Sequence, residues 1–228
     1  MTDTPTWQQL ADLARDLAAT DVHREGAVRP TVYGYCGDHL IAGIELRPHP
    51  AGGNEAPLVE ALALLVPAGA DRLAFLGSGR AWSLEDPVPP VCDEGDLRQR
   101  VAVLLTADRH QRDRPTLSST LMPFRCSGGQ VDWSEPVHLD EHPEGPLPMI
   151  LAAALTGPPD TASDGITLGR QALRLARLGH GLQLPEAGGD GRIAGYLLAA
   201  LDSEAAGDPQ PGWVLGPEHV SGHRDPSA

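Results

Sequence analysis

A short apolar run covers residues 101–107, which lie between Arg100 and Asp108. A run of this length suits a strand and is too short for an independent helix. Its β-branched side chains favour a strand that is buried on both faces. We therefore expect residues 101–107 to be the central strand of a sheet.

Three other segments have the pattern of β-hairpins, in which extended stretches flank residues that favour a tight turn. They are residues 31–46 with Gly37-Asp38 at the turn, residues 73–84 with Gly77-Ser78-Gly79, and residues 117–133 with Ser127-Gly128-Gly129. Pro123 cannot donate a backbone hydrogen bond, so the first strand of the last hairpin is expected at a sheet edge or at a bulge.

Five segments have the spacing or composition of helices. Residues 7–20 carry apolar side chains every three or four positions, which predicts an amphipathic helix that covers the sheet. Asn54 is placed to cap a nearly apolar helix over residues 55–66, which we expect to form a buried layer. Three further helices are predicted over residues 148–155, 166–178 and 193–206.

This order of elements predicts an α+β fold, with an antiparallel central sheet of about five to seven hairpin-built strands covered by N-terminal, middle and C-terminal helices. We expect residues 1–206 to form a single domain. Residues 145–206 either complete its core or form a small helical appendage, and we favour the first because these helices have few apolar partners of their own. Residues 207–228 have the composition of a flexible tail.

The composition excludes several classes of function. The 228 residues carry a formal net charge of −14. Such a surface repels phosphate backbones and anionic lipids, so neither nucleic acid nor a membrane is an expected partner. All 17 basic residues are arginines. The lack of lysine excludes Schiff-base chemistry and lysine-bound pyridoxal phosphate, and we predict no cofactor.

The sequence also predicts a cytoplasmic protein. Its three cysteines lie far apart and suit a reducing compartment better than a disulfide framework. The first residues are polar and acidic, unlike a secretory signal. No apolar run approaches the ~20 residues that a membrane-spanning helix needs.

The hairpin over residues 31–46 contains the candidate catalytic residues. If Gly37 and Asp38 form a two-residue turn, Cys36 and His39 are paired across the strands with Cβ atoms ~4.5–5.5 Å apart. His39 could then assist Cys36 as a thiolate nucleophile or join it as a soft ligand.

Strict alternation places Gly34, Gly43 and Glu45 on the same face as Cys36 and assigns the other, more apolar face to the main core. Because a glycine leaves room above the backbone, Gly34, Gly43 and Glu45 are candidates for ligand binding. In the alternative interpretation the glycines admit a covering helix, Cys36 is a small buried side chain and His39 lies in water. We favour this alternative because no third group is placed to orient His39.

Other motifs fail on closer inspection. Cys92 and Arg98 have the spacing of cysteine phosphatases, but the acidic residues between them would repel a phosphate. The histidine pairs at 138/142 and 219/223 are four residues apart, yet prolines place the first pair in a loop and the second lies in the tail. We therefore predict no metal site.

Charged side chains on two of the predicted helices complete the set of candidates. Arg170, Arg174 and Arg177 form a stripe that could contact an anion or an acidic partner, although salt bridges within this acidic protein explain it as well. Glu60 is the one charge within an otherwise apolar helix after its first residue. We expect it at an exposed or rim position, because the neighbouring leucines define the core face.

Two classes of function remain. The first is a non-catalytic binding or regulatory module for a protein or small-molecule partner, and it is favoured because no complete catalytic signature is present. The second is a small thiol- or histidine-dependent enzyme that uses Cys36 and His39. The sequence does not identify the partner or the oligomeric state.

Overall fold

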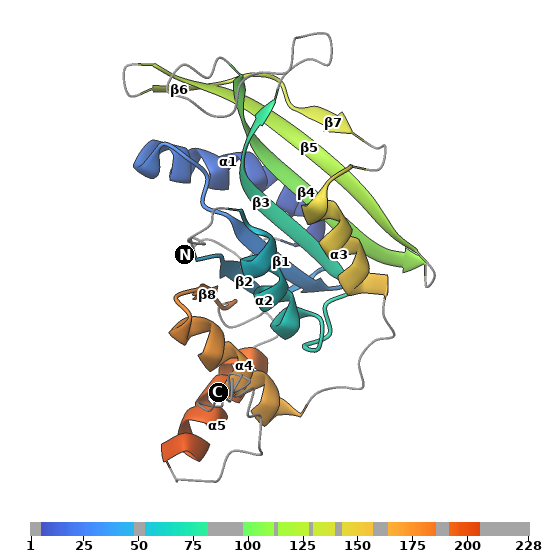
Figure 1. Cartoon of the computed structure of the whole chain (residues 1–228), viewed down its shortest axis with the longest axis vertical. Coiled ribbons are helices and arrows are strands. Elements are labelled where there is room, and N and C mark those ends of the chain that lie inside the picture. The colour runs from blue at the N-terminus through green and yellow to red at the C-terminus, as the bar shows by residue number, and fades with distance from the viewer. Residues whose placement is uncertain are drawn as a thin grey trace, which may run out of the picture.

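The computed structural model describes the chain in eight segments. They are residues 6–47, 53–81, 98–111, 114–127, 130–139, 143–156, 164–185 and 192–205. These segments contain an eight-stranded antiparallel sheet and five helices, so the predicted α+β fold with a helix-covered antiparallel sheet is confirmed (Figure 1). Cys92, His142, the pair 219/223 and the predicted tail over residues 207–228 lie outside the described residues.

Seven strands follow one another in the order β6-β5-β4-β3-β1-β2-β8, and β7 also pairs with β5. Their bounds are β1 (Thr31–Cys36), β2 (His39–Glu45), β3 (Arg72–Ala81), β4 (Gln99–Gln111), β5 (Arg114–Ser127), β6 (Gln130–Trp133), β7 (Val137–Leu139) and β8 (Gly181–Gln183). The run 101–107 lies within β4, between β3 and β5, which agrees with its predicted central position. The short strands β7 and β8 were not predicted from the sequence.

The predicted hairpin turn at Gly77-Ser78-Gly79 is wrong, because β3 runs straight through these residues. Their partners in β4 continue in unbroken register from Gly77 to Gly79. A Cβ atom on Gly77 would lie 2.8 Å from the Phe75 ring, so the glycine leaves room for that ring. The Ser78 side chain accepts a hydrogen bond from the Val28 amide at 2.7 Å, which ties the strand to the segment before β1.

The first hairpin forms as predicted at its turn but contains a bulge. Cys36 pairs with His39 and Tyr35 with Leu40, whereas Gly34 pairs with Ala42. One residue of β2, Ile41, therefore has no partner of its own in β1. Beyond this bulge every side chain of β2 points to the face opposite to the one that strict alternation assigns.

β5 forms hairpins on both sides. It pairs with β4 along most of its length, and the predicted pairing around residues 127–130 joins it to β6. On the side away from β4, β7 pairs with Ser119 to Leu121 of β5, and the pairing of β5 with β6 begins at Phe124. Pro123 lies in the gap between these two pairings. Its lack of a backbone N–H therefore costs no hydrogen bond of the sheet, although β5 is not an outer strand.

The helices are α1 (Trp7–Glu25), α2 (Glu55–Leu65), α3 (Pro146–Thr156), α4 (Gly165–Arg177) and α5 (Arg192–Ala205). At the start of α1, Thr6 and Gln9 form a reciprocal capping box, and Gly26 ends the helix in the left-handed region with φ of 73°. The expected cap of α2 is absent, since the Asn54 side chain makes no capping hydrogen bond and its backbone is already helical. Within the described residues no helix is both long enough and apolar enough to cross a membrane.

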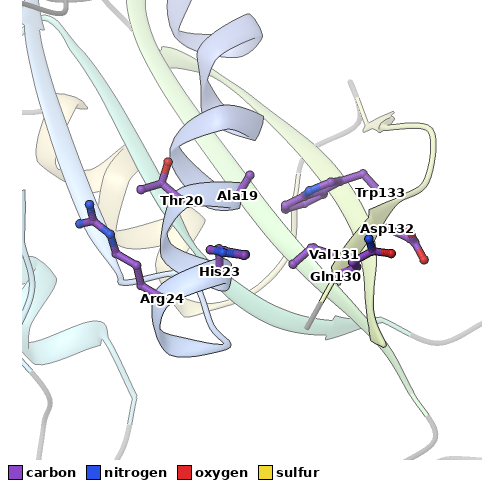
Figure 2. Close-up of a pocket in the computed structure, with 8 residues that line it drawn as sticks. All are labelled: Ala19, Thr20, His23, Arg24, Gln130, Val131, Asp132 and Trp133. Atoms are coloured by element: carbon purple, nitrogen blue, oxygen red, sulfur yellow. The ribbon is translucent and has the colours of Figure 1, made fainter. Parts of the chain in front are cut away.

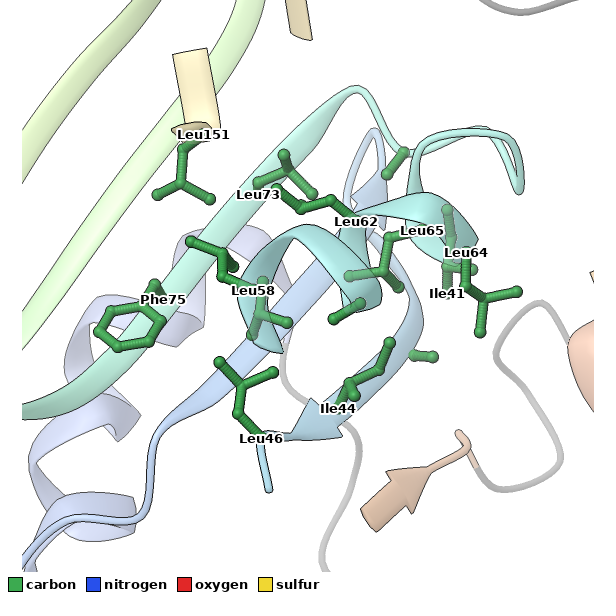
Figure 3. Close-up of a cluster of buried hydrophobic side chains, with 14 of the residues drawn as sticks. Ile41, Ile44, Leu46, Leu58, Leu62, Leu64, Leu65, Leu73, Phe75 and Leu151 are labelled. Carbon is green, nitrogen blue, oxygen red and sulfur yellow. The ribbon is translucent and has the colours of Figure 1, made fainter. Parts of the chain in front are cut away.

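The two faces of the sheet carry different layers. The main cluster of buried apolar side chains unites β1, β2 and β3 with helices α2, α3, α4 and α5, and Figure 3 shows its leucines around α2. On the opposite face, a second cluster is covered by α1, which supplies Leu10, Ala14, Ala18 and Val22. Among the described helices, four therefore pack on the main cluster and one packs on the second cluster. α2 is less buried than predicted, because Val59 remains 53% exposed.

Candidate functional site

Cys36 and His39 lie together as predicted, at the tip of the first hairpin. They are direct register partners across the two-residue turn. Cys36 is half-buried and packs against the main cluster, whereas His39 is exposed to solvent. The structure therefore brings the two residues together on the face that holds the main core.

The bulge at Ile41 separates two of the other candidates of this hairpin from the face of Cys36. Gly43 and Glu45 lie beyond the bulge and so belong to the α1 face, which corrects the predicted shared face. The space above Gly34 is filled by a helix, because a Cβ atom there would lie 2.9 Å from Cδ2 of Leu65. At this position the glycine admits α2, as in the interpretation that we favoured from the sequence.

Strict alternation assigns Tyr33, Tyr35, Leu40, Ala42, Ile44 and Leu46 to the main core, and the structure divides this set. Tyr33, Tyr35 and Leu40 belong to the second cluster, under α1, which corrects their assignment. Ala42, Ile44 and Leu46 lie in the main cluster as expected, because the bulge turns them to the face of Val32.

Glu45 takes part in an ion-pair network around Arg29. The Arg29 guanidinium donates to Glu45 Oε2 at 2.8 Å and to Asp21 Oδ1 at 2.8 and 2.9 Å. Asp21 is buried on α1, and its other oxygen accepts from the Arg29 amide at 3.0 Å. The hydrogen bond with Asp21 is the main reason why the pKa of Arg29 is raised. This arrangement fixes α1 to the entry of β1 and satisfies the buried carboxylate.

The predicted arginine stripe lies on α4. Arg170 is half-buried, while Arg174 and Arg177 are exposed in the last turn of the helix. Positive charge is favourable at that end of a helix, because the backbone carbonyls there carry partial negative charge. A role of Arg170, Arg174 and Arg177 in binding an anion stays a prediction.

Glu60 on α2 lies at the centre of a network that sequence analysis missed. Its carboxylate accepts from the Arg47 guanidinium at 3.1 and 3.3 Å and lies 2.9 Å from Nε2 of His180. His180 is buried, and its Nδ1 accepts a hydrogen bond from the Arg47 amide at 3.3 Å. Since Nδ1 is an acceptor, the proton of the neutral ring lies on Nε2 and is donated to Glu60. The network connects α2, the end of β2 and the turn before β8.

This network lowers the pKa of Glu60. Burial alone would raise the pKa, but the hydrogen bonds from Arg47 and His180 favour the ionised carboxylate and outweigh burial. Both oxygens of the Glu60 carboxylate already accept hydrogen bonds from Arg47 or His180. We therefore interpret Glu60 as a structural residue that holds these segments together.

Replacing Glu60 with glutamine should reduce stability by about 1–3 kcal/mol at neutral pH, because a charged hydrogen-bond acceptor for two partners is lost. The folded pKa of Glu60 lies below its ordinary value, so its contribution is complete above about pH 4.5 and is lost as the pH falls through the folded pKa. Urea unfolding of both proteins between pH 7 and pH ~3 should therefore show a difference that shrinks on acidification. Glu135→Gln, at an exposed loop position, is the control. A difference independent of pH would contradict this account.

Two hollows border α1 on the face of the second cluster. The larger, which we call the Trp133 hollow, has a volume of about 730 Å³ and lies between the C-terminal half of α1 and β6 (Figure 2). Its lining residues are Ala19, Thr20, His23, Arg24, Gln130, Val131, Asp132 and Trp133. Charges of both signs, Arg24 and Asp132, are part of this lining, and both residues are exposed.

The second hollow, the Trp7 hollow, is smaller and more enclosed, with a volume of about 420 Å³. It lies between the N-terminal part of α1 and the strands β4, β5 and β7. Its lining residues are Trp7, Gln8, Leu10, Ala11, Leu104, Thr106, Ser118, Thr120 and His138. None of these residues is an aspartate, glutamate or arginine, so the lining has no permanent charge within the part of the chain that the structure describes.

Two hydrogen-bonded pairs form the polar side of the Trp7 hollow. The hydroxyls of Thr106 and Ser118 are 2.6 Å apart on neighbouring strands. Thr120 Oγ1 lies 3.0 Å from Nδ1 of His138. These residues face the same way because Thr106 is the register partner of Ser118, and Thr120 of His138. The pairing of β4, β5 and β7 thus collects four polar side chains that are dispersed in the sequence.

Among the described residues no group of three or more His, Cys, Asp or Glu side chains is arranged to hold a metal ion. No protein-family model, curated protein or solved structure matches this chain. The function must therefore be inferred from the geometry of its own residues.

Proposed function

We propose that the chain is a non-catalytic cytoplasmic binding module, and that its ligand is a small uncharged molecule in the Trp7 hollow. The observation that carries this proposal is the lining of that hollow. In a chain with a net charge of −14, the described lining of this half-open space combines aromatic, aliphatic and hydroxyl groups without a permanent charge. Ligand pockets typically pair an apolar wall with a few placed polar groups.

The apolar wall of the hollow is held in place by its neighbours. The Trp7 ring lies 5.4 Å from the Tyr35 ring at an interplanar angle of 71°, and the Arg72 guanidinium lies 5.6 Å from its centre. Tyr35 is fully buried, and Arg72 is itself paired with Asp38 and Asp108. A ring with such partners loses little freedom when it binds a ligand, which favours affinity.

Filling the hollow should test this proposal. Ala11 is an exposed residue of α1 at the hollow, and Ala11→Phe would place a ring in the space without disturbing a buried side chain. In a ligand-observed NMR screen of small fragments, we expect uncharged fragments to bind the wild-type protein. We expect Ala11→Phe to weaken this binding at least about tenfold, which corresponds to ~1.4 kcal/mol.

The matched control is Ala63→Phe, at an exposed position of α2 that lies outside the hollow. It should bind the same fragments as the wild-type protein. If both variants retain the fragments equally, or if only charged fragments bind, the proposal is wrong.

A thiol- or histidine-dependent enzyme is the alternative, favoured by the direct pairing of Cys36 with His39. The two functions differ in the reactivity of Cys36. In a Cys92→Ser, Cys126→Ser background, rapid alkylation of Cys36 that is slowed by His39→Ala would support the enzyme. The binding module needs neither property, because Cys36 is then a small side chain packed against the main cluster.

A further inference from the structure

The polar side of the Trp7 hollow has groups that both donate and accept hydrogen bonds. In the Thr106–Ser118 pair one hydroxyl donates to the other, so the second retains a hydrogen that can be donated to a ligand. The Thr120–His138 pair behaves in the same way. If Thr120 donates to Nδ1 of His138, the ring proton lies on Nε2, which can donate to a ligand. In the other tautomer Nδ1 donates to Thr120, and Nε2 can accept.

Hydroxyl groups of this kind suit a ligand that itself carries hydroxyls. A serine or threonine hydroxyl rotates to donate or to accept, and a sugar hydroxyl has the same freedom. A nucleobase edge has donors and acceptors in fixed positions, which proteins read with amides, guanidinium groups or carboxylates. The lining residues of the hollow include three hydroxyl side chains and one amide, Gln8. This composition favours a polyol over a base.

The opposite side of the hollow is suited to the apolar face of a ring. Trp7 and Leu10 of α1 contribute it, and Trp7 is fixed by its contacts with Tyr35 and Arg72. Leu104 is the register partner of Thr120 and lies on the strand side, among the hydroxyls. Aromatic rings are preferred anchors in recognition because they offer a large rigid area at little cost in entropy. The α1 side of the space is therefore apolar, and the strand side carries the hydroxyls together with Leu104.

We infer that the Trp7 hollow binds an uncharged sugar, with the C–H face of its ring against Trp7 and its hydroxyls directed to the Thr106–Ser118 and Thr120–His138 pairs. The inference rests on the proposed binding function and specifies its ligand class. The absence of a permanent charge in the lining disfavours sugar phosphates and uronic acids, because the excess negative charge of the protein would repel them. A volume of about 420 Å³ has room for one or two sugar rings.

The experiment uses the whole 228-residue chain and four named probes: glucose, galactose, N-acetylglucosamine and maltose. Each is titrated to ~100 mM, a range that detects even weak binding, while the indole N–H signal of Trp7 is followed by NMR. Trp7→Phe assigns that signal. We expect at least one sugar to shift it in a saturable way. Uracil, a nucleobase without a sugar, serves as the comparison.

Three substitutions of threonine by valine locate the binding. Thr106→Val and Thr120→Val preserve the shape of the side chain and remove one hydroxyl each from the hollow. We expect either one to weaken sugar binding roughly threefold to tenfold, as is typical for the loss of one hydrogen bond. Thr20→Val makes the same change at the Trp133 hollow and should leave the affinity unchanged.

Several results would overturn the inference. It fails if none of the four sugars shifts the Trp7 signal, or if sugar binding is unaffected by both Thr106→Val and Thr120→Val. It also fails if uracil alone binds at Trp7, although the proposed binding function then stands. The proposed function fails separately, in the fragment screen, if Ala11→Phe has no effect.

Discussion

Replacement of Leu73 by aspartate is expected to abolish folding. Leu73 lies in β3, is fully buried in the main cluster, and is paired with Gly34 on one side and Ala107 on the other. An ionised carboxylate at this position has no described partner and would cost several kcal/mol, against a total stability of ~5–15 kcal/mol for a domain. Circular dichroism and size-exclusion chromatography should therefore find no cooperative thermal transition.

The control for this substitution is Val59→Asp on α2. Val59 belongs to a helix that covers the same cluster, but it is 53% exposed, so its carboxylate remains in water. We expect its stability to change by no more than about 1 kcal/mol. A Leu73→Asp protein that is soluble and melts at the wild-type temperature would show that β3 is not buried as described.

Replacement of Gly169 by alanine should destabilise the packing of α5 on α4. A Cβ atom at this position would overlap the Tyr196 carbonyl oxygen, and backbone cannot move aside as a flexible side chain can. The two helices must separate, at an expected cost of about 1–3 kcal/mol for overpacking. Hydrogen exchange should show faster exchange in α5, while β3 and β4 remain protected.

The matched control, Gly195→Ala, should have the opposite sign. Gly195 is also inside a helix, α5, but an added Cβ atom meets nothing within 4 Å. Alanine should then stabilise the helix by about 0.5–1 kcal/mol through its better helix propensity. If Gly169→Ala also stabilises the protein, helix propensity and not the α4–α5 contact determines the effect.

The sequence was sufficient to predict those helices and turns whose pattern lies within one short segment of the chain. The amphipathic spacing of residues 7–20 and the Gly37-Asp38 turn correspond to α1 and to the β1–β2 hairpin. The glycines of residues 77–79 misled the prediction because glycine marks two different needs. It favours tight turns, and it also leaves space beside a strand, which is what the Phe75 ring requires of Gly77.

The bulge at Ile41 and the two α1 hollows could not be predicted, because they depend on contacts between distant segments. Nothing in the residues around Ile41 distinguishes a bulged strand from a regular one, yet the extra residue decides which face receives Gly43 and Glu45. Likewise, Thr106 and Ser118 meet only because β4 and β5 pair in one particular register. His180 and Glu60, 120 positions apart in the chain, are a further case.

The three-residue strand β7 has a consequence for the kinetics of ligand exchange. Among the described strands it pairs with β5 alone, through Ser119, Thr120 and Leu121, and both Val137 and Leu139 are exposed. Segments with few buried contacts open locally at a small fraction of the global free energy of unfolding. Opening of β7 would carry His138 away from Thr120 and widen the Trp7 hollow while β3 and β4 stay folded. Rates of ligand entry and release would then follow the local opening of β7 and be insensitive to changes in the main cluster.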